Sequence, residues 1–295
     1  MTDAELFEDL RRPMLGIAYR MLGSVAGAED VVQEAFLRLF AARRRGERID
    51  SPRAYLSTIV TRLSIDELRS ARARRETYVG EWLPEPVVDE AGVGGDPAAL
   101  VEQEDSLSMA FLLLLERLSP RQRAAFLLHD VFAYGYDEVA EIVRTSEANA
   151  RQLAARSRRL IGERRPRFEA SRERRDALAE RFFAAAGDGD IEELEALLAD
   201  DVRLIGDGGG KAPALARILS GRARVARTLR NWARAARRLE GLRMRRVTVN
   251  GQPGLVYVRE DGSVFSVLAL DIADGRVQVV RGIVNPDKLS HLRPM

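Results

Sequence analysis

The sequence predicts a multidomain protein with two all-α domains and a C-terminal α+β domain whose sheet curls into a cone. Apolar residues recur at helical spacing up to about residue 161. A stretch rich in Pro, Gly and acidic residues interrupts this pattern at 77–106. Beyond residue 240, strand-like runs are separated by Asn-Gly or Asp-Gly pairs, which favour tight hairpin turns. Helices followed by such a meander indicate an α+β arrangement.

Length and composition set the number of domains and exclude several classes of chemistry. A chain of 295 residues with 46% hydrophobic content suits two or three domains, and we expect the segments 1–76, 77–106, 107–165 and 172–291. Cysteine is absent and only two histidines occur, so we expect no disulfide, metal or cofactor. No apolar run could cross a bilayer and the acidic N-terminus is unlike a signal peptide, which predicts a cytoplasmic protein without membrane contact.

The first domain is expected to consist of helices, and its most informative helix covers residues 28–40. Five apolar side chains share one face and should pack inward, namely Val31, Val32, Ala35, Phe36 and Leu39. Asp30, Gln33, Glu34 and Arg38 should then form a polar edge. A second helix starts at Ser51-Pro52, a good N-terminal cap, and its C-terminal part is rich in Arg.

Residues 77–106 are expected to be a linker. From Glu81 to Asp105 the chain has eight acidic residues and no Lys or Arg, which would keep a spacer extended by self-repulsion. Self-repulsion does not explain Trp82-Leu83-Pro84-Glu85-Pro86, because a Trp and a Leu are poorly placed in a free linker.

The second domain contains a predicted helix-turn-helix. Ser119 to Gln122 form a capping box that opens a helix to about Phe132. A short helix at 136–143, a turn at 145–147 and a helix at 148–161 follow. In the last helix the expected buried face is Ala150, Leu153, Ala154, Leu160 and Ile161. The outward face carries Asn149, Arg151, Gln152, Arg156, Arg158 and Arg159, which are residue types suited to base edges and phosphates.

The C-terminal third should contain two helices, at 172–186 and 191–199, a strand at 202–206, and an Arg-rich helix at 222–239. The last four strands are expected at 242–249, 254–260, 263–271 and 276–283. The Arg side chains of the helix at 222–239 most simply form a solvated face, and contact of these side chains with DNA or with the acidic linker is the alternative. The Gly-rich sequence Asp207-Gly208-Gly209-Gly210-Lys211 lacks the spacing of a nucleotide-binding loop and is interpreted as a turn.

Taken together, residues 1 to about 162 resemble regions two and four of bacterial sigma factors of the extracytoplasmic-function group. The resemblance is carried by the helix at 28–40, by Ser119-Pro120-Arg121-Gln122-Arg123 and by the helix-turn-helix, in the correct order. The order of elements in the C-terminal third resembles the SnoaL-like fold. The sequence is thus similar to sigma factors with a fused C-terminal SnoaL-like domain, whose partners are core RNA polymerase and promoter DNA.

The resemblance also implies which residues make these contacts. The core polymerase contact would involve Asp30, Gln33, Glu34, Phe36 and Leu37. The minus-ten promoter element would be bound by Arg44, Arg45, Ile49, Arg62, Arg69 and Arg72. The minus-thirty-five element would be bound by Ser146, Asn149, Arg151, Gln152, Arg156 and Arg158.

Three short motifs strengthen the resemblance and suggest regulation in cis. They are Trp82-Leu83-Pro84-Glu85-Pro86, Asp207-Gly208-Gly209-Gly210-Lys211 and Asn285-Pro286-Asp287-Lys288-Leu289. We expect the linker to make an intramolecular contact with the C-terminal domain, because its apolar residues need a covering surface. The sign of this regulation, and whether a small ligand enters the C-terminal pocket, stay open.

Two alternative functions remain at the level of sequence. The resembled fold also hosts isomerases and cyclases that use an Asp base, for which Asp201, Asp207 and Asp271 are the candidates. Fold alone does not establish activity, and we expect no catalytic residue here. The other alternative is a conventional DNA-binding regulator, which would have no use for a polymerase-contact edge.

Overall fold

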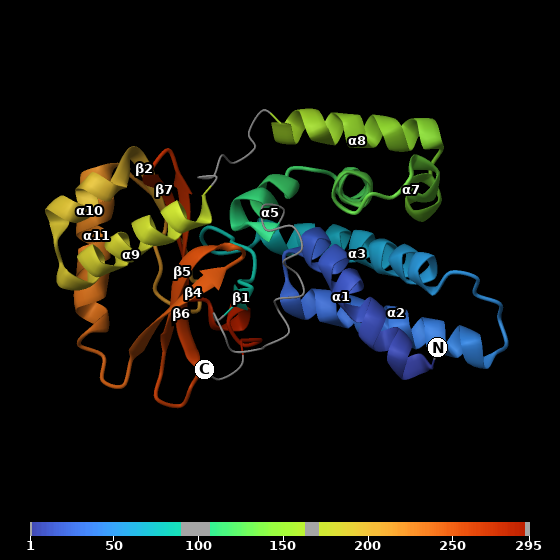
Figure 1. The fold of residues 1–295 in the computed structure, drawn as a ribbon, viewed down its shortest axis with the longest axis horizontal. Coiled ribbons are helices and arrows are strands. Elements are labelled where there is room, and N and C mark those ends of the chain that lie inside the picture. The colour runs from blue at the N-terminus through green and yellow to red at the C-terminus, as the bar shows by residue number, and fades with distance from the viewer. Residues whose placement is uncertain (1, 90–106, 163–170, 293–295) are drawn as a thin grey trace. The chain divides into compact units, whose positions relative to one another are not determined.

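The computed structural model describes residues 2–89, 107–162 and 171–292, with only the backbone at 71–76 (Figure 1). The chain divides into two compact units. Unit 1 comprises Met1–Thr77 and Asp96–Arg165, and unit 2 comprises Tyr78–Gly95 and Pro166–Met295. The first part of the predicted linker therefore belongs to the same unit as the C-terminal domain. No helix in the described ranges is long and apolar enough to span a membrane.

Unit 1 begins with three helices, α1 (Asp3–Leu22), α2 (Val25–Arg44) and α3 (Pro52–Glu76). A capping box between Thr2 and Glu5 starts α1, and Gly23 ends it with a left-handed backbone at φ 66°. The Ser24 side chain accepts from the Gly27 amide at 3.0 Å and caps α2. The face predicted for the 28–40 helix is confirmed, since all five of its apolar side chains are buried.

The rest of unit 1 forms the predicted helix-turn-helix domain. Its elements are α5 (Met109–Leu115), α6 (Pro120–Phe126), the π-helical turn η2 (Leu127–Val131), α7 (Tyr136–Val143) and α8 (Glu147–Gly162). The capping box of Ser119 and Gln122 is present as expected. The helix predicted to run to Phe132 changes from α to π geometry after Phe126, a local change of hydrogen-bonding register that apolar periodicity does not reveal.

Buried Arg123 ties the two parts of unit 1 together. Its Nε donates to the Arg20 carbonyl at 3.0 Å, and its Nη1 forms a 2.5 Å ion pair with Glu116. Burial lowers the pKa of Arg123 to about 9. The Ser57 and Tyr134 hydroxyls, 2.5 Å apart, add a second buried polar link. The Arg of the Ser119-to-Arg123 motif is thus a packing residue of unit 1.

Unit 2 consists of helices packed on a seven-stranded sheet with the order β1-β4-β5-β6-β7-β2-β3. The helices are α9 (Arg172–Asp188), α10 (Ile191–Leu197), α11 (Arg222–Ala236) and the 3-10 turn η3 (Pro286–Lys288). The strands are β1 (Val88–Asp89), β2 (Leu198–Asp207), β3 (Leu219–Ser220), β4 (Arg243–Val249), β5 (Gln252–Val258), β6 (Val264–Ala273) and β7 (Arg276–Ile283). The two longer helices and α10 cover one face of the sheet (Figure 1).

The hairpin turns follow the sequence prediction. Asn250 and Gly251 have positive φ of 51° and 73°, and Asp274 and Gly275 have 52° and 66°, as tight turns of this type require. All neighbouring strands pair antiparallel except β2 and β7, which are parallel and place Asp207 beside Ile283. This parallel pair brings the ends of β2 and β7 to the same edge of the cone.

Strand β1 lies within the segment that the sequence predicted to be a spacer. Val88 pairs with Val249 and Asp89 with Thr248, so the chain after Val87 adds an edge strand to β4. The Val87 amide donates to Asn250 Oδ1 at 3.0 Å, and the Asn250 amide donates to the Val87 carbonyl at 2.8 Å. Two residues are too short a run for a periodicity signal, which is why this strand was not predicted.

Candidate functional site

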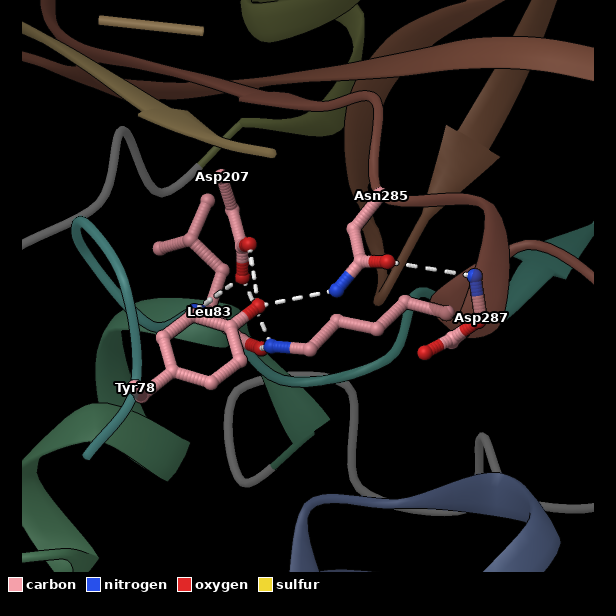
Figure 2. A network of polar contacts seen from close by, with 6 residues as sticks. Tyr78, Leu83, Asp207, Asn285 and Asp287 are labelled. Carbon is pink, nitrogen blue, oxygen red and sulfur yellow. Dashed lines mark hydrogen bonds and ion pairs between the residues drawn. The ribbon is translucent and has the colours of Figure 1, made fainter. Parts of the chain in front are cut away.

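The most distinctive polar site of unit 2 joins the docked segment, residues 78–89, to the ends of β2 and β7. We call this site the clasp and define it as Tyr78, Leu83, Asp207, Asn285 and Lys288. Figure 2 shows that its labelled side chains converge from the docked segment, the end of β2 and the chain after β7. All three short motifs contribute to it.

Asp207 is the centre of the clasp and is fully buried. Its Oδ1 accepts from the Tyr78 hydroxyl at 2.5 Å, and its Oδ2 accepts from the Leu83 amide at 2.7 Å and from Lys288 Nζ at 2.6 Å. Its main-chain carbonyl accepts from the Val284 and Asn285 amides at 2.9 and 3.1 Å. Both carboxylate oxygens of Asp207 and its main-chain carbonyl thus have hydrogen-bond partners.

Lys288 supplies the opposite charge and is itself almost inaccessible. Besides the Asp207 carboxylate, Lys288 Nζ bonds the Leu83 carbonyl. The ammonium also lies over two aromatic rings, 4.8 Å from the centroid of Tyr78 and 4.5 Å from that of Trp82. The docked segment therefore contacts Lys288 through a backbone carbonyl and both of its aromatic side chains.

Tyr78 is held in its neutral form. Burial is the main cause that raises the pKa of its phenol, and the hydrogen bond to Asp207 raises it further. The phenol oxygen also accepts from Asn285 Nδ2 at 2.9 Å. Tyr78 is thus both donor and acceptor in a closed chain of hydrogen bonds.

The Gly-rich turn is shaped by the need for close approach. Gly209 has φ 57°, and a Cβ at this position would lie 2.2 Å from Asn285 Nδ2 and 3.0 Å from the Tyr78 hydroxyl. Any larger residue would push the clasp apart. At the exposed rim, Lys211 Nζ pairs with Asp287 at 2.5 Å, which links the second and third motifs.

Sequence reasoning missed Tyr78, Asn250 and His291. Tyr78 stands four residues before Trp82, and this aromatic pair at the start of an acidic linker was a usable signal. His291 Nε2 lies 2.9 Å from the Pro86 carbonyl, and its Nδ1 lies 3.9 Å from Glu85. Nothing in the local sequence of Asn250 or His291 indicated a partner more than 160 positions away.

An apolar pocket of about 250 Å³, here called the cone pocket, lies between α9, α11 and the concave face of the sheet. None of the three candidate carboxylates lines it. Asp201 is exposed, Asp207 belongs to the clasp, and Asp271 is buried in a 2.5 Å ion pair with Arg281. Among the described residues, no group of His, Asp and Glu is arranged to hold a metal ion.

The predicted polymerase-contact edge lies on α2. Asp30, Gln33 and Leu37 are exposed, and Leu37 is unusual in exposing 54% of its surface despite being apolar. Glu34 is half-buried and accepts from Arg38 at 2.7 Å. Phe36 requires a correction, because it is only 2% exposed and its ring lies 4.8 Å from that of Phe7. It supports the edge from the core and cannot itself reach a partner.

The residues predicted to bind the minus-ten element fall into two groups. Arg44, Arg45 and Arg69 are exposed, Ile49 is half-buried, and the Arg72 side chain lies outside the described residues. Arg62 instead donates to the Ile142 carbonyl at 3.0 Å and to the Glu141 carbonyl at 2.9 Å, at the C-terminal end of α7. In this state Arg62 satisfies a helix terminus of the second domain.

On α8, the helix predicted to bind the minus-thirty-five element, Gln152 and Arg156 are exposed. Ser146 caps the helix by accepting from the Asn149 amide at 3.2 Å, and Asn149 Nδ2 donates to Thr145 Oγ1 at 2.6 Å. Four of the five residues predicted for the buried face are buried or half-buried, but Leu160 is wrong, since 47% of it is exposed.

Tyr136 positions two of the α8 arginines. Arg151 lies over its ring at 4.5 Å and pairs with Glu147. Arg158 donates to its hydroxyl at 2.7 Å and lies 3.4 Å from Asp130. Binding of DNA by Arg151 or Arg158 would have to replace these contacts.

Comparisons with known proteins agree on all three domains. Residues 6–74 match Sigma-70 region 2, residues 108–161 match Sigma-70, region 4, and residues 179–284 match the SnoaL-like domain. The ECF RNA polymerase sigma factor SigJ of Mycobacterium tuberculosis is 40% identical over 292 residues, covering 96% of this chain and 92% of the relative. The probable ECF RNA polymerase sigma factor SigI of the same species is 33% identical over 96% of this chain and 93% of its own length. The crystal structure of M. tuberculosis SigJ aligns with a TM-score of 0.77 at 36% identity, covering 99% of this chain and all of that one.

Proposed function

The chain belongs to the ECF RNA polymerase sigma factors, and from this premise we propose that its C-terminal domain restrains the sigma part in cis by holding the docked segment in the clasp. A sigma factor is a specificity subunit for transcription initiation and not itself an enzyme.

One observation carries the proposal, namely the buried ion pair of Asp207 and Lys288 that is completed by groups of the docked segment. The Leu83 amide and the Tyr78 hydroxyl both donate to the Asp207 carboxylate. Removing the docked segment would leave a buried charge pair short of hydrogen-bond partners, which costs free energy. Docking is therefore favourable for the C-terminal domain.

The docked segment starts directly after α3, the helix expected to bind the minus-ten element. In sigma factors the connector between the DNA-binding domains is expected to thread through the polymerase cleft. A segment buried in the clasp is unavailable for that path, so engagement of polymerase has to release it. The contact free energy of the clasp then sets how strongly the domain opposes holoenzyme formation.

The remaining roles are assigned to the exposed residues. We assign core polymerase contact to Asp30, Gln33 and Leu37 on α2, with Glu34 at their margin. The recognition helix α8 would approach the minus-thirty-five element through Gln152 and Arg156, which are exposed. The C-terminal domain acts through contact and not through catalysis, and the placement of all three candidate carboxylates away from the cone pocket supports this.

Transcription with limiting amounts of the full chain tests the proposal. Lys288→Met breaks the buried pair, whereas Lys211→Met breaks only the exposed pair with Asp287 and serves as the matched control. Core polymerase would be titrated with each protein on a promoter recovered from genomic fragments that the wild-type holoenzyme enriches. We expect Lys288→Met to give severalfold more transcript at sub-saturating protein, with the same plateau as the control. Equal or lower output, from a variant whose circular dichroism shows it to be folded, would contradict restraint by the clasp.

A further inference from the structure

The cone pocket is a feature of unit 2 that neither the sigma function nor the clasp explains. Its wall is built from helices α9 and α11, strands β5 to β7 and the loop after β2. Its mouth is bordered by Trp232, Leu239 and Met244, which expose 36%, 50% and 46% of their surfaces. Such a concave apolar surface with an apolar mouth is typical of a small-molecule site.

The chemistry of the wall selects an uncharged molecule. No Arg, Lys, Asp or Glu side chain is among the described residues that line the pocket. Its two side-chain hydroxyls belong to Tyr257 and Ser266. Burial raises the pKa of Tyr257, so its phenol stays neutral, and within the described chain this hydroxyl makes no hydrogen bond. It is available to orient one polar group of a mostly hydrocarbon ligand.

The volume indicates the size of that ligand. A dry protein cavity of about 150 Å³ lined by apolar side chains is sufficient to bind benzene. The cone pocket has about 250 Å³ and also opens to solvent, so it accommodates more than one aromatic ring. A molecule with two fused rings, or an equivalent alicyclic skeleton, fits this range.

The pocket and the clasp are built from adjacent residues of the same strand ends. Gly206 lines the pocket and the next residue is Asp207, while Val284 lines the pocket and the next residue is Asn285. Successive residues of an extended chain face opposite sides, so the two sites share one wall. The loop after β2 also contributes to both sites, because Ala214 lines the pocket and Gly209 lies close to Asn285 of the clasp.

We propose that the cone pocket binds an uncharged, largely apolar small molecule of about two rings, and that its occupancy strengthens docking of residues 78–89 in the clasp. A ligand in the pocket fixes the strand ends and the loop in the arrangement that also forms the clasp. The ligand thus binds the docked state better than the released state, and that difference is what couples the two sites. The regulatory consequence rests on the proposed function, but the binding and the coupling do not.

The first experiment measures binding with a defined probe. The probe 6-propionyl-2-(dimethylamino)naphthalene is uncharged, has one fused ring pair and no further ring, and its fluorescence shifts and brightens in apolar surroundings. Ala233 lines the pocket from α11, so Ala233→Leu should fill it, whereas Ala223→Leu adds the same side chain at an exposed position of the same helix. We expect saturable binding to the wild type and to Ala223→Leu, and at least tenfold weaker binding to Ala233→Leu. Equal binding by all three proteins, or no binding by the wild type, overturns the pocket assignment.

The second experiment measures coupling on the purified full chain. The Leu83 and Val87 amides donate to Asp207 and Asn250, so their hydrogen exchange reports docking directly. Saturating probe should slow exchange of both amides about fivefold or more, and Asp207→Asn should weaken probe binding by a similar factor, because coupling is reciprocal. Unchanged exchange together with unchanged affinity overturns the coupling even if the probe binds. A pocket covered by a second copy of the chain would show probe affinity that falls as protein concentration rises, which also overturns the proposal.

These readouts involve no polymerase or promoter. Failure of the proposed function would appear as unchanged transcription from clasp variants while probe binding and amide exchange still respond. Failure of the present inference would leave the transcription result intact.

Discussion

Lys288 and Asp207 form an ion pair at 2.6 Å in which the lysine side chain is 8% exposed and the carboxylate is not exposed at all. Two charges this deep are costly to remove from water, and the pair is favourable only when further hydrogen bonds complete it. Three such bonds come from Tyr78 and Leu83, which lie more than 120 positions before Asp207. The ion pair is therefore favourable only while the docked segment is in place.

Breaking the pair should open the clasp. Asp207→Asn removes the charge that balances Lys288, and loss of one partner of a buried pair costs about 3 to 5 kcal/mol. The free energy of opening, obtained from hydrogen exchange of the Leu83 amide, should fall by that amount or to the detection limit. Lys211→Met, at an exposed pair, should change it by at most about 1 kcal/mol. Similar losses in both variants would mean that burial of the pair is not what holds the segment.

Docking should weaken in alkali because of Tyr78. The pKa of this phenol is raised in the folded state, so its contribution to docking is complete below the usual tyrosine value near 10 and is lost as pH rises through the higher folded value. The chain has two Trp, so Trp232→Phe leaves Trp82 as the only reporter of the clasp. Acrylamide quenching of Trp82 should increase above about pH 10.

Two phenylalanine substitutions separate Tyr78 from other groups that titrate in alkali. Tyr78→Phe should flatten the part of the quenching curve that belongs to this phenol. Tyr257→Phe removes a second phenol of raised pKa from the same unit but leaves the clasp unchanged. If the curves of the two variants coincide, ionisation of Tyr78 does not control docking.

Arg62 should stabilise unit 1 in the absence of DNA. Arg62→Met removes two hydrogen bonds to the carbonyls at the end of α7, which at a partly exposed site contribute together about 1 kcal/mol. Amide exchange across α7 should speed up accordingly. Arg69→Met, whose partner Asp66 is on its own helix, should leave α7 within about 0.5 kcal/mol of wild type. An unaffected α7 in Arg62→Met would show that these contacts carry no net stability.

Gln152 and Arg159 should have different effects on promoter binding by holoenzyme. Gln152→Ala should cost about 1 to 3 kcal/mol at one base pair of the minus-thirty-five element and relax preference there. Arg159→Ala should weaken binding evenly across sequences and reduce the slope against log salt by about one. Binding of a randomised element by each variant, measured at several salt concentrations, checks both. Superimposable base preferences for wild type and Gln152→Ala would remove Gln152 from the readout.

Charge reversal on α2 should weaken the polymerase contact. Asp30→Lys places a cation on the exposed edge and should raise the Kd for core polymerase at least tenfold, which is about 1.4 kcal/mol. Glu192→Lys makes the same change at an exposed position of α10, in unit 2, and should leave the Kd unchanged. Fluorescence anisotropy of labelled protein titrated with core polymerase gives both values. Equal affinities would place the contact elsewhere.

The sequence predicted the elements whose signals are local. Helical periodicity located α2 and α7, the capping box of Ser119 and Gln122 located the start of α6, and the Asn-Gly and Asp-Gly pairs located the hairpins of the sheet. It was harder to predict which side chains of a helix are buried, because burial depends on the elements packed against it. Phe36 is buried by Phe7 of α1, and Leu160 is exposed although it continues the apolar spacing of α8.

The clasp was predictable only in part. The three motifs contain Leu83, Asp207, Asn285 and Lys288, so most of the site was singled out before any fold was known. The pairing of these residues could not be predicted from the sequence, because Asp207 and Lys288 are 81 positions apart and meet only through the parallel register of β2 and β7. Tyr78 and the short strand β1 had no periodicity of their own.

Strand β1 also determines which part of β4 would be uncovered if the docked segment were released. Among the residues that the structure describes, β1 covers only Thr248 and Val249 of β4, so the rest of β4 is a sheet edge there. Release would extend that unpaired edge by Thr248 and Val249. The other end of β4 carries Arg243, Arg245 and Arg246, and charged edge residues discourage edge-to-edge association. The same strand that would give up the connector thus carries its own protection against aggregation.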